Sequence, residues 1–493
     1  MNIQQWCNVD ESLIVAETDE IYKKYSGLPY SNKNILSLSK LRFMNSKLFL
    51  DSYDEPVELY VSVADSFVES STRDLELKLH DQRTKKIVSK KHLFPDGIRI
   101  NWNNWRQYNS HEKDSGKRKE VFDEFIIATR YISPIIFDRF KKIKILYSKV
   151  NDQNESVRTI ELDPLNSYLY HERISYEKLV DFVTNMGNKA RKPFEKTLKD
   201  ISSEILGRNA EYYDDFYFFR NKVYDDFQKV FHKIDPIKEV KKILKILSFD
   251  LTKISFDFED RKDKYPSPIC FFVQIPQDIR ILYKSESPYF DLQGCFHESG
   301  HAMHASSINS KLEYWKKYFI SMGVAEIFSI LLERLTKNRI FLQNSLGIND
   351  SNLLDKLEQR NNFMELFFVT FYSANSLMKA DFWKKDLNVS KSNSLYSDLV
   401  KRFTGIKVPG EYWMLHHILP EAIMYVPSYL FAAIRAKELD LVLVNKFGEK
   451  WWLDKAAGNY LKDLMSPGSD IDLSSFSNLD TSLFLKEINS TIN

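Results

Sequence analysis

The chain has 493 residues, of which 43% are hydrophobic and 28% are charged, the balance of an ordinary globular protein. A formal net charge of +2 gives no reason to expect binding to nucleic acid or to an anionic membrane. Phe (35) and Tyr (26) are abundant and Gly (14) is scarce, which argues against a glycine-rich phosphate-binding fold and favours long helices with aromatic packing.

The cysteine content and the N-terminus favour a reducing compartment. Cys7, Cys270 and Cys295 are an odd and sparse set that does not form a disulfide framework. The first residues lack a basic segment followed by an apolar one, so we expect no secretion signal. The most apolar long stretch, residues 418–434, contains Glu421 and two prolines and is not expected to span a bilayer. A soluble, cytoplasmic protein is therefore predicted.

The N-terminal half divides into two regions with different patterns. Residues 57–63 and 75–81 alternate apolar and polar side chains, as half-buried strands do. From about residue 118 to 247, apolar residues recur three and four positions apart, which is typical of surface helices. We therefore predict a mixed α/β region over residues 1–110 and a helical lobe over residues 111–250.

The C-terminal half begins with a proline-rich segment. Residues 269–275 and 278–283 have the pattern of two short strands that are joined by a turn at Pro276. Helical patterns then resume and continue nearly to the end of the chain. The sequence thus predicts a third, mostly helical region over residues 251–493.

The segment His297-Glu298-Ser299-Gly300-His301 carries the clearest chemical pattern in the sequence. Two histidines four positions apart leave the same face of a helix, where both ring nitrogens can bind one zinc ion. Glu298 would lie beside the metal, where its carboxylate can take a proton from water. The flanking residues are apolar, so the helix is expected to be buried, and buried histidines need partners such as a metal.

A catalytic zinc site needs a third protein ligand. His304 lies about 10 Å from His297 along the helix axis, too far for both to share the ion, and is expected to pack or to support the site. Glu326 is the better candidate, because it lies on an otherwise apolar helix 25 residues after the motif. Ser329 and Glu333 follow at intervals of about one and two turns and could orient a ligand histidine.

These residues resemble the thimet oligopeptidase and oligopeptidase F family of zinc metallopeptidases, and in particular its bacterial branch. The family pattern HExGHxxH is present at residues 297–304. It is followed in the family by a helix with Glu, Ser and a second Glu, which match Glu326, Ser329 and Glu333. The similarity extends over roughly residues 256–468.

The resemblance implies a mainly α, two-lobed molecule with a few short strands and a deep substrate channel. It implies one Zn²⁺ per chain on the channel floor and short peptides as substrates. In this family a histidine and tyrosines from the C-terminal segment approach the scissile carbonyl, and the matching positions are His416 or His417, Tyr425 and Tyr429. We expect a monomer or a homodimer.

In the implied mechanism, Zn²⁺ held by His297, His301 and Glu326 lowers the pKa of a water molecule. Glu298 takes the proton as general base and later passes it to the leaving amine. The oxyanion would be stabilised by zinc and by a tyrosine hydroxyl or a histidine from residues 416–429.

The main prediction is a zinc-dependent metalloendopeptidase that acts on short peptides. A zinc carboxypeptidase is an alternative, because helical zinc carboxypeptidases share the HExxH motif and a Glu on a following helix. A second alternative is a non-catalytic helical adaptor that keeps zinc as a structural ion. Glu298 argues against the adaptor, since a structural site has no use for that carboxylate.

Overall fold

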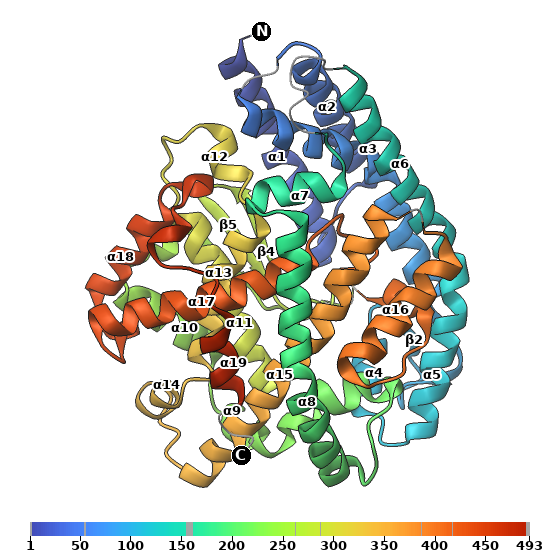
Figure 1. Cartoon of the computed structure of the whole chain (residues 1–493), viewed down its shortest axis with the longest axis vertical. Coiled ribbons are helices and arrows are strands. Elements are labelled where there is room, and N and C mark those ends of the chain that lie inside the picture. Colours follow the sequence, from blue (N-terminus) through green and yellow to red (C-terminus); the bar gives the residue numbers. More distant parts are fainter. Residues whose placement is uncertain are drawn as a thin grey trace.

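The protein is built mainly of α-helices (Figure 1). The computed structural model describes residues 2–53, 56–153, 161–261, 263–285, 287–385, 387–416 and 418–489. The elements of the first half are α1 (Ile3–Ser26), α2 (Asn32–Leu50), α3 (Val57–Lys86), β1 (Val88–Leu93), β2 (Arg99–Asn101), α4 (Trp105–His111), α5 (Ser115–Ala128), α6 (Ser133–Gln153), α7 (Pro164–Glu172), α8 (Tyr176–Leu206), α9 (Gln228–Phe231) and α10 (Pro236–Ile246). Those of the second half are β3 (Ile254–Asp257), β4 (Ile269–Gln274), β5 (Asp278–Leu282), α11 (Pro288–Ser307), α12 (Tyr314–Tyr318), α13 (Met322–Leu335), α14 (Arg339–Asn344), α15 (Ser351–Lys384), α16 (Val389–Thr404), α17 (Val426–Phe447), α18 (Lys455–Met465) and α19 (Thr481–Asn489).

The N-terminal region contains three long helices, α1 to α3, followed by the antiparallel hairpin of β1 and β2. Residues 57–63 and 75–81, which the alternating pattern predicts as strands, both lie inside α3, so that prediction was wrong. For residues 57–63 the reason is the packing of α3 between α2 and α6. Residues 59–64 are all buried, so the helix has no polar face there that would reveal its period of 3.6.

A three-stranded sheet lies beside the helix that carries the metal motif. β4 pairs antiparallel with β5, and β3 pairs parallel with the other edge of β5. The two strands predicted at residues 269–275 and 278–283 are therefore confirmed. Ile279 and Ile281 of β5 pack in one cluster with Ala302 and Ala305 of α11, so the sheet supports one face of this helix.

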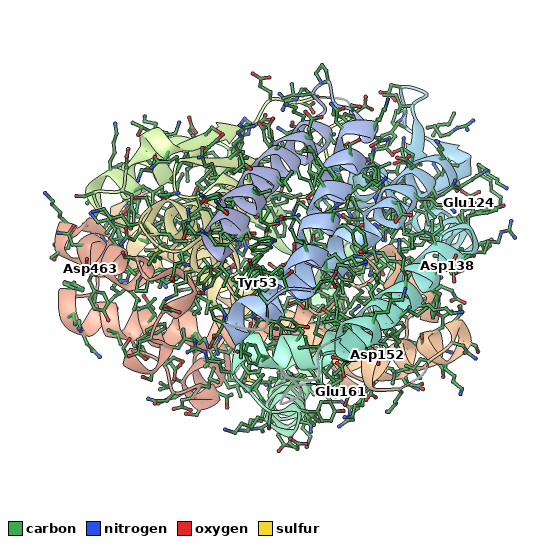
Figure 2. All side chains as sticks on the ribbon, turned by 90° about the horizontal axis from the view of Figure 1, so that it is seen from above. Tyr53, Glu124, Asp138, Asp152, Glu161 and Asp463 are labelled. Atoms are coloured by element: carbon green, nitrogen blue, oxygen red, sulfur yellow. The ribbon has the colours of Figure 1, made fainter. Side chains whose placement is uncertain are left out.

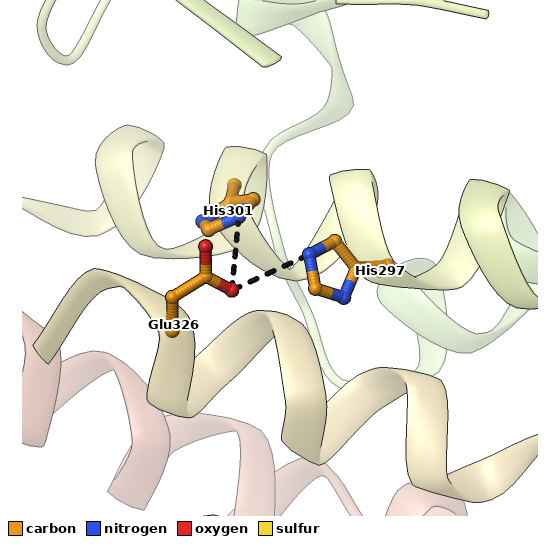
Figure 3. A group of neighbouring side chains, drawn as sticks. All are labelled: His297, His301 and Glu326. Carbon is orange, nitrogen blue, oxygen red and sulfur yellow. Dashed lines mark ion pairs between the residues drawn. The ribbon is translucent and has the colours of Figure 1, made fainter. Parts of the chain in front are cut away.

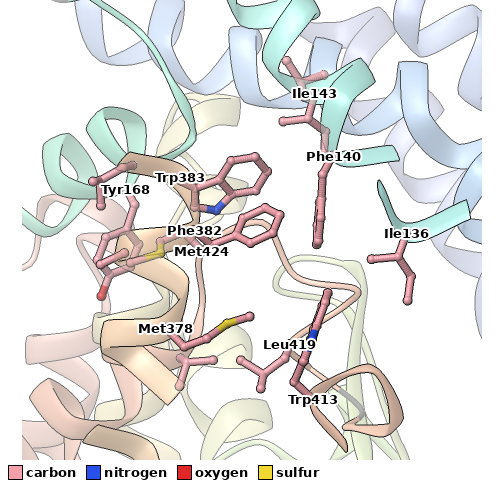
Figure 4. Packing of buried hydrophobic residues seen from close by; sticks show 14 of the residues in the cluster. Ile136, Phe140, Ile143, Tyr168, Met378, Phe382, Trp383, Trp413, Leu419 and Met424 are labelled. Atoms are coloured by element: carbon pink, nitrogen blue, oxygen red, sulfur yellow. The ribbon is translucent and has the colours of Figure 1, made fainter. Parts of the chain in front are cut away.

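Two large hydrophobic clusters hold the helices together. The first joins the N-terminal helices to the end of α15, where the ring centroids of Phe140 and Phe382 are 4.8 Å apart and Trp413 packs nearby (Figure 4). The second surrounds α11 and α13 and includes Phe296 and Leu331. The 34-residue helix α15 contributes to both clusters, and it therefore links the two halves of the core.

Charged side chains cover the outside of the molecule. On α6, Ile136 and Phe140 are buried while Asp138 and Asp152 are exposed, as expected of an amphipathic surface helix. In the view from above, these two aspartates lie on the opposite side of the molecule from Asp463 of α18 (Figure 2). None of the helices in the described ranges combines the length and the apolar composition that crossing a bilayer requires.

Candidate metal centre

The metal motif lies on α11, and α11 packs against α13. Gly300, inside the motif, allows the two helix backbones to approach closely. A Cβ atom at this position would lie 2.3 Å from the carbonyl oxygen of Phe328 and 2.5 Å from the Cα of Ser329, both on α13. The glycine is therefore required for the contact that brings the two halves of the site together.

His297, His301 and Glu326 converge between these two helices (Figure 3). Each offers one ligand atom, and the three atoms lie within 4.8 Å of one another. Glu326 Oε2 is 3.4 Å from His297 Nε2 and 3.6 Å from His301 Nε2. Zinc bonds of about 2.0–2.1 Å place tetrahedral ligand atoms about 3.3–3.4 Å apart. Two imidazoles and one carboxylate at this spacing fit a zinc ion.

Glu333 and Ser329 orient the candidate ligands. The Nδ1 of His297 lies 2.9 Å from Glu333 Oε2, and a proton donated there leaves the Nε2 lone pair free for a metal. Lys337 in turn contacts the other oxygen of Glu333 at 2.7 Å. The Ser329 hydroxyl donates to Glu326 Oε2 at 2.8 Å. Both side chains lie on α13. Glu333 contacts a ligand histidine, as its spacing suggests, whereas Ser329 contacts the carboxylate of Glu326 instead.

Burial and neighbouring groups set the pKa values of the site. Burial opposes the charge of Glu326, but the His301 and His297 imidazoles lower the pKa of this carboxyl to about 2. Burial lowers the pKa of His301 to about 4. Burial also acts to lower the pKa of His297, but its contacts with Glu326 and Glu333 outweigh burial and raise that pKa above its ordinary value. Burial also raises the pKa of Glu298 to about 7, which suits a group that accepts and returns a proton.

A cavity of about 780 Å³ opens onto the three candidate ligands and Glu298. Its lining comes from distant parts of the sequence, including α4, residues 215–221, β4, α15 and the start of α17. Arg106 and Arg220 bring positive charge to it. The volume lies in the range of sites that enclose small ligands, and it leaves room for a short peptide.

The predicted tyrosines lie at the start of α17 and line this cavity. Tyr425 donates a hydrogen bond to Glu326, so its hydroxyl is directly beside a candidate ligand. The ring of Tyr429 lies 5.1 Å from that of Tyr425, measured between centroids. Tyr425 is therefore the one of the pair that touches the metal centre.

The predicted histidines occupy different positions. His416 lines the cavity; its Nδ1 accepts from the backbone N–H of Ile418 at 3.2 Å, and burial lowers its pKa to about 3. His417 lies outside the described residues. His304 does not join the candidate ligands: it is buried, and its ring lies 4.6 Å from that of Phe328.

Several residues that line the cavity were not predicted from the sequence. Arg106 and Arg220 lie far from the motif along the chain, and only the fold brings them to it. Phe368, Phe371 and Tyr372 of α15 also line the cavity. Their spacing shows that they share one face of a helix, but an aromatic face predicts a buried core as readily as a binding site.

A family model and several solved structures are similar to the chain. The model for carboxypeptidase Taq (M32) metallopeptidases matches residues 220–372, which contain His297, His301 and Glu326. A search of curated proteins found no match. A structure of PZ peptidase A with an inhibitor has a TM-score of 0.62 and 13% identity, and the match covers 99% of this chain and 86% of that one.

Two further structures show the same likeness. An M32 carboxypeptidase from Deinococcus radiodurans R1 has a TM-score of 0.60 and 13% identity, over 99% of this chain and 97% of that one. A Bacillus anthracis str. Ames protein described as an oligoendopeptidase F has a TM-score of 0.59 and 13% identity, over 98% and 94%. At this identity the structures show the fold alone.

The comparisons confirm the mainly α fold with a few short strands. They support the relationship to a zinc metallopeptidase family, but the family model that matches is M32 and not oligopeptidase F. The chain therefore has the fold of the helical metallopeptidases, and its metal-binding segment is similar to that of the carboxypeptidase Taq (M32) family.

Proposed function

We propose that the protein is a zinc-dependent carboxypeptidase that removes residues from the C-terminus of short peptides. The observation that carries this proposal is the convergence of His297, His301 and Glu326 beside Glu298, within the segment that the M32 carboxypeptidase model matches. This alternative replaces the endopeptidase prediction, because that prediction rested on the resemblance to oligopeptidase F.

The residues of the site divide the chemistry between them. His297, His301 and Glu326 would hold Zn²⁺, which when bound supplies a Lewis acid that polarises the peptide carbonyl and activates water. Glu298 accepts a proton from the attacking water and returns it to the leaving amine. The Tyr425 hydroxyl, now bonded to Glu326, is close enough to donate to the oxygen on which negative charge develops.

A carboxypeptidase must also recognise the free C-terminal carboxylate of its substrate, which calls for a cation in the cavity. Arg106 and Arg220 line the cavity. Burial is the main cause of the low pKa of His416. The positive charges of Arg106 and Arg220 lower this pKa further, so both arginines lie near His416. The Arg106 Nη1 donates to Ser267 at 2.9 Å, whereas Arg220 is exposed. Arg220 is therefore the better candidate for the carboxylate.

Product analysis tests the proposal. A peptide with a free C-terminus and its C-terminally amidated form are incubated with the zinc-loaded protein, with and without a chelator, and the products are identified by mass spectrometry. We expect stepwise loss of C-terminal residues from the free peptide, little reaction with the amide, and no reaction after chelation. Internal cleavage of both peptides at similar rates would instead establish the endopeptidase.

The absence of any cleavage would favour the non-catalytic adaptor. The Glu298→Gln variant is the matched control, because its site keeps all three candidate ligands. A cytoplasmic location, a monomer or homodimer, and one Zn²⁺ per chain remain part of the proposal.

A further inference from the structure

An aromatic face of α15 is turned toward the cavity. Phe367, Phe368, Phe371 and Tyr372 are spaced so that their side chains share one side of the helix. All four line the cavity and are only partly buried. Val369, between them, is fully buried in the core. The rings therefore present a surface to the cavity while the opposite side of the helix packs inside the protein.

This aromatic surface is continuous with the metal centre. Tyr425 is bonded to Glu326, and its ring lies 5.1 Å from Tyr429. Tyr429 lies 5.2 Å from Tyr372, which lies 4.8 Å from Phe368. These centroid separations are those of favourable aromatic pairs, so each ring restrains the next. An ordered row of rings thus leads from a candidate ligand to α15.

The other end of the row lies near the positive charges of the cavity. The ring of Phe371 is 5.8 Å from that of His416, the residue near Arg106 and Arg220. Tyr372 interacts electrostatically with both Arg220 and Glu326, and all three line the cavity. A peptide that reaches from the metal centre toward Arg220 would therefore pass along these rings.

We propose that Phe367, Phe368, Phe371 and Tyr372, together with Tyr429, form a subsite for a large apolar side chain of the substrate, next to the scissile bond. This inference rests on the proposed peptidase function and names the substrate class: peptides with Phe, Tyr or Leu at this position. A charged side chain would lose its hydration against the rings. An alanine would leave most of the surface uncovered.

Kinetics on matched peptides test the subsite. Peptides of one length carry Phe, Leu, Ala or Lys on either side of the scissile bond, and kcat/KM is measured for each. We expect the Phe and Leu peptides to exceed the Ala peptide by about tenfold or more at one of the two positions, the range that hydrophobic pockets achieve. Equal values for Phe and Ala at both positions would overturn the subsite.

Substitutions in the aromatic row test which side chains cause the preference for the Phe peptide. Phe368→Ala and Phe371→Ala should each lower kcat/KM for the Phe peptide by about tenfold and leave the Ala peptide within about twofold. Phe371→Leu should restore most of the preference, which separates loss of the apolar surface from misfolding. Phe290→Ala is the control, because Phe290 lines the cavity from α11 and its ring packs against Tyr224, which is not part of the aromatic row. Equal losses on both peptides would contradict the proposal.

Binding without turnover separates the two proposals. N-acetylphenylalanine and N-acetylalanine are titrated into the full-length, zinc-loaded Glu298→Gln protein by calorimetry. We expect at least about tenfold tighter binding of the phenylalanine compound, and loss of that difference when Phe371→Ala is added. Binding with this preference but no hydrolysis by the unmodified protein would support the subsite and refute the peptidase. Hydrolysis by the unmodified protein, with no preference for phenylalanine over alanine in either the kinetic or the binding assay, would support the peptidase and refute the subsite.

Discussion

The Glu172 carboxylate accepts a hydrogen bond at 2.8 Å from the backbone N–H of Gly323, although 151 positions separate the two residues. Gly323 lies in the first turn of α13, where backbone N–H groups have no partner within the helix. Arg435 of α17 donates to Glu172 Oε2 at 3.2 Å and to the Gly323 carbonyl at 3.1 Å. A Cβ on Gly323 would lie 2.2 Å from Glu172 Oε2, so any larger residue here would displace this carboxylate. α7 and α17 thereby position the helix turn that precedes Glu326.

Replacement of Glu172 by alanine should weaken both the fold and the metal site. The ion pair with Arg435 is almost fully buried, and removal of one partner leaves an uncompensated charge that costs about 3–5 kcal/mol. Urea denaturation should show this loss, and a zinc competition assay should show weaker binding. Glu172→Gln keeps an acceptor for Gly323 and should have a smaller effect on zinc. Unchanged zinc affinity in the alanine variant would refute the positioning role.

Glu298→Gln should retain the metal and lose nearly all peptidase activity. Glutamine has the same shape but cannot accept the proton of the attacking water, and general-base catalysis typically contributes about 10²–10⁴-fold. Metal analysis of the purified variant and kcat/KM on a good substrate provide the two measurements. Activity near that of the unmodified protein, in a metal-replete sample, would remove Glu298 from the role of general base.

Glu326→Ala should lose the metal, whereas Glu333→Gln should only weaken its binding. Glu326 offers a ligand atom itself. Glu333 acts through the ring of His297, and loss of such a supporting contact typically costs about 10–100-fold in metal affinity. Competition with a chromogenic chelator measures both. Full zinc occupancy in the Glu326 variant would exclude it as a ligand.

Arg220→Gln should raise KM for peptides with a free C-terminus. The guanidinium is the proposed partner of the substrate carboxylate, and hydrogen bonds to charged groups contribute about 1.5–3 kcal/mol, or roughly 10- to 150-fold. Arg106→Gln serves as the comparison, since this side chain is already bonded to Ser267. If both variants keep the KM of the unmodified protein, another group must bind the carboxylate.

Glu17 should make stability depend on pH in the acid range. Burial raises the pKa of this carboxyl, but Arg73 and Arg42 outweigh burial and hold the pKa below its ordinary value. A pKa that is lower in the folded state adds stability above the unfolded value of about 4.3, and this stability is lost as the pH falls through the folded pKa. Glu17→Gln should therefore be less stable at pH 7.

Urea midpoints measured from pH 7 to pH 3 check this expectation. The difference between the unmodified protein and Glu17→Gln should be largest at neutral pH and should shrink below about pH 4. Glu17 joins Arg42 of α2 at 2.6 Å and Arg73 of α3 at 3.2 Å, so the unfolding of the N-terminal helices is the relevant transition. A difference that does not change with pH would contradict the argument.

The sequence by itself determined the core of the candidate metal centre. Helix geometry requires residues 297 and 301 to share a face, and a carboxylate on an apolar helix needs a partner, which singled out Glu326. The short strands β4 and β5 were also predictable, because the turn at Pro276 separates two short apolar runs. These are local rules, and they depend only on residues close together along the chain.

Tertiary structure alone decided the rest. Residues 57–63 belong to α3 despite their alternating pattern, because α3 packs between α2 and α6 and residues 59–64 are all buried. Glu172, Arg220 and the rings of α15 reach the centre from distant segments, and no local pattern records which surfaces will meet. Whether an aromatic stripe becomes core or cavity wall depends on what packs against it, which is a property of the folded molecule.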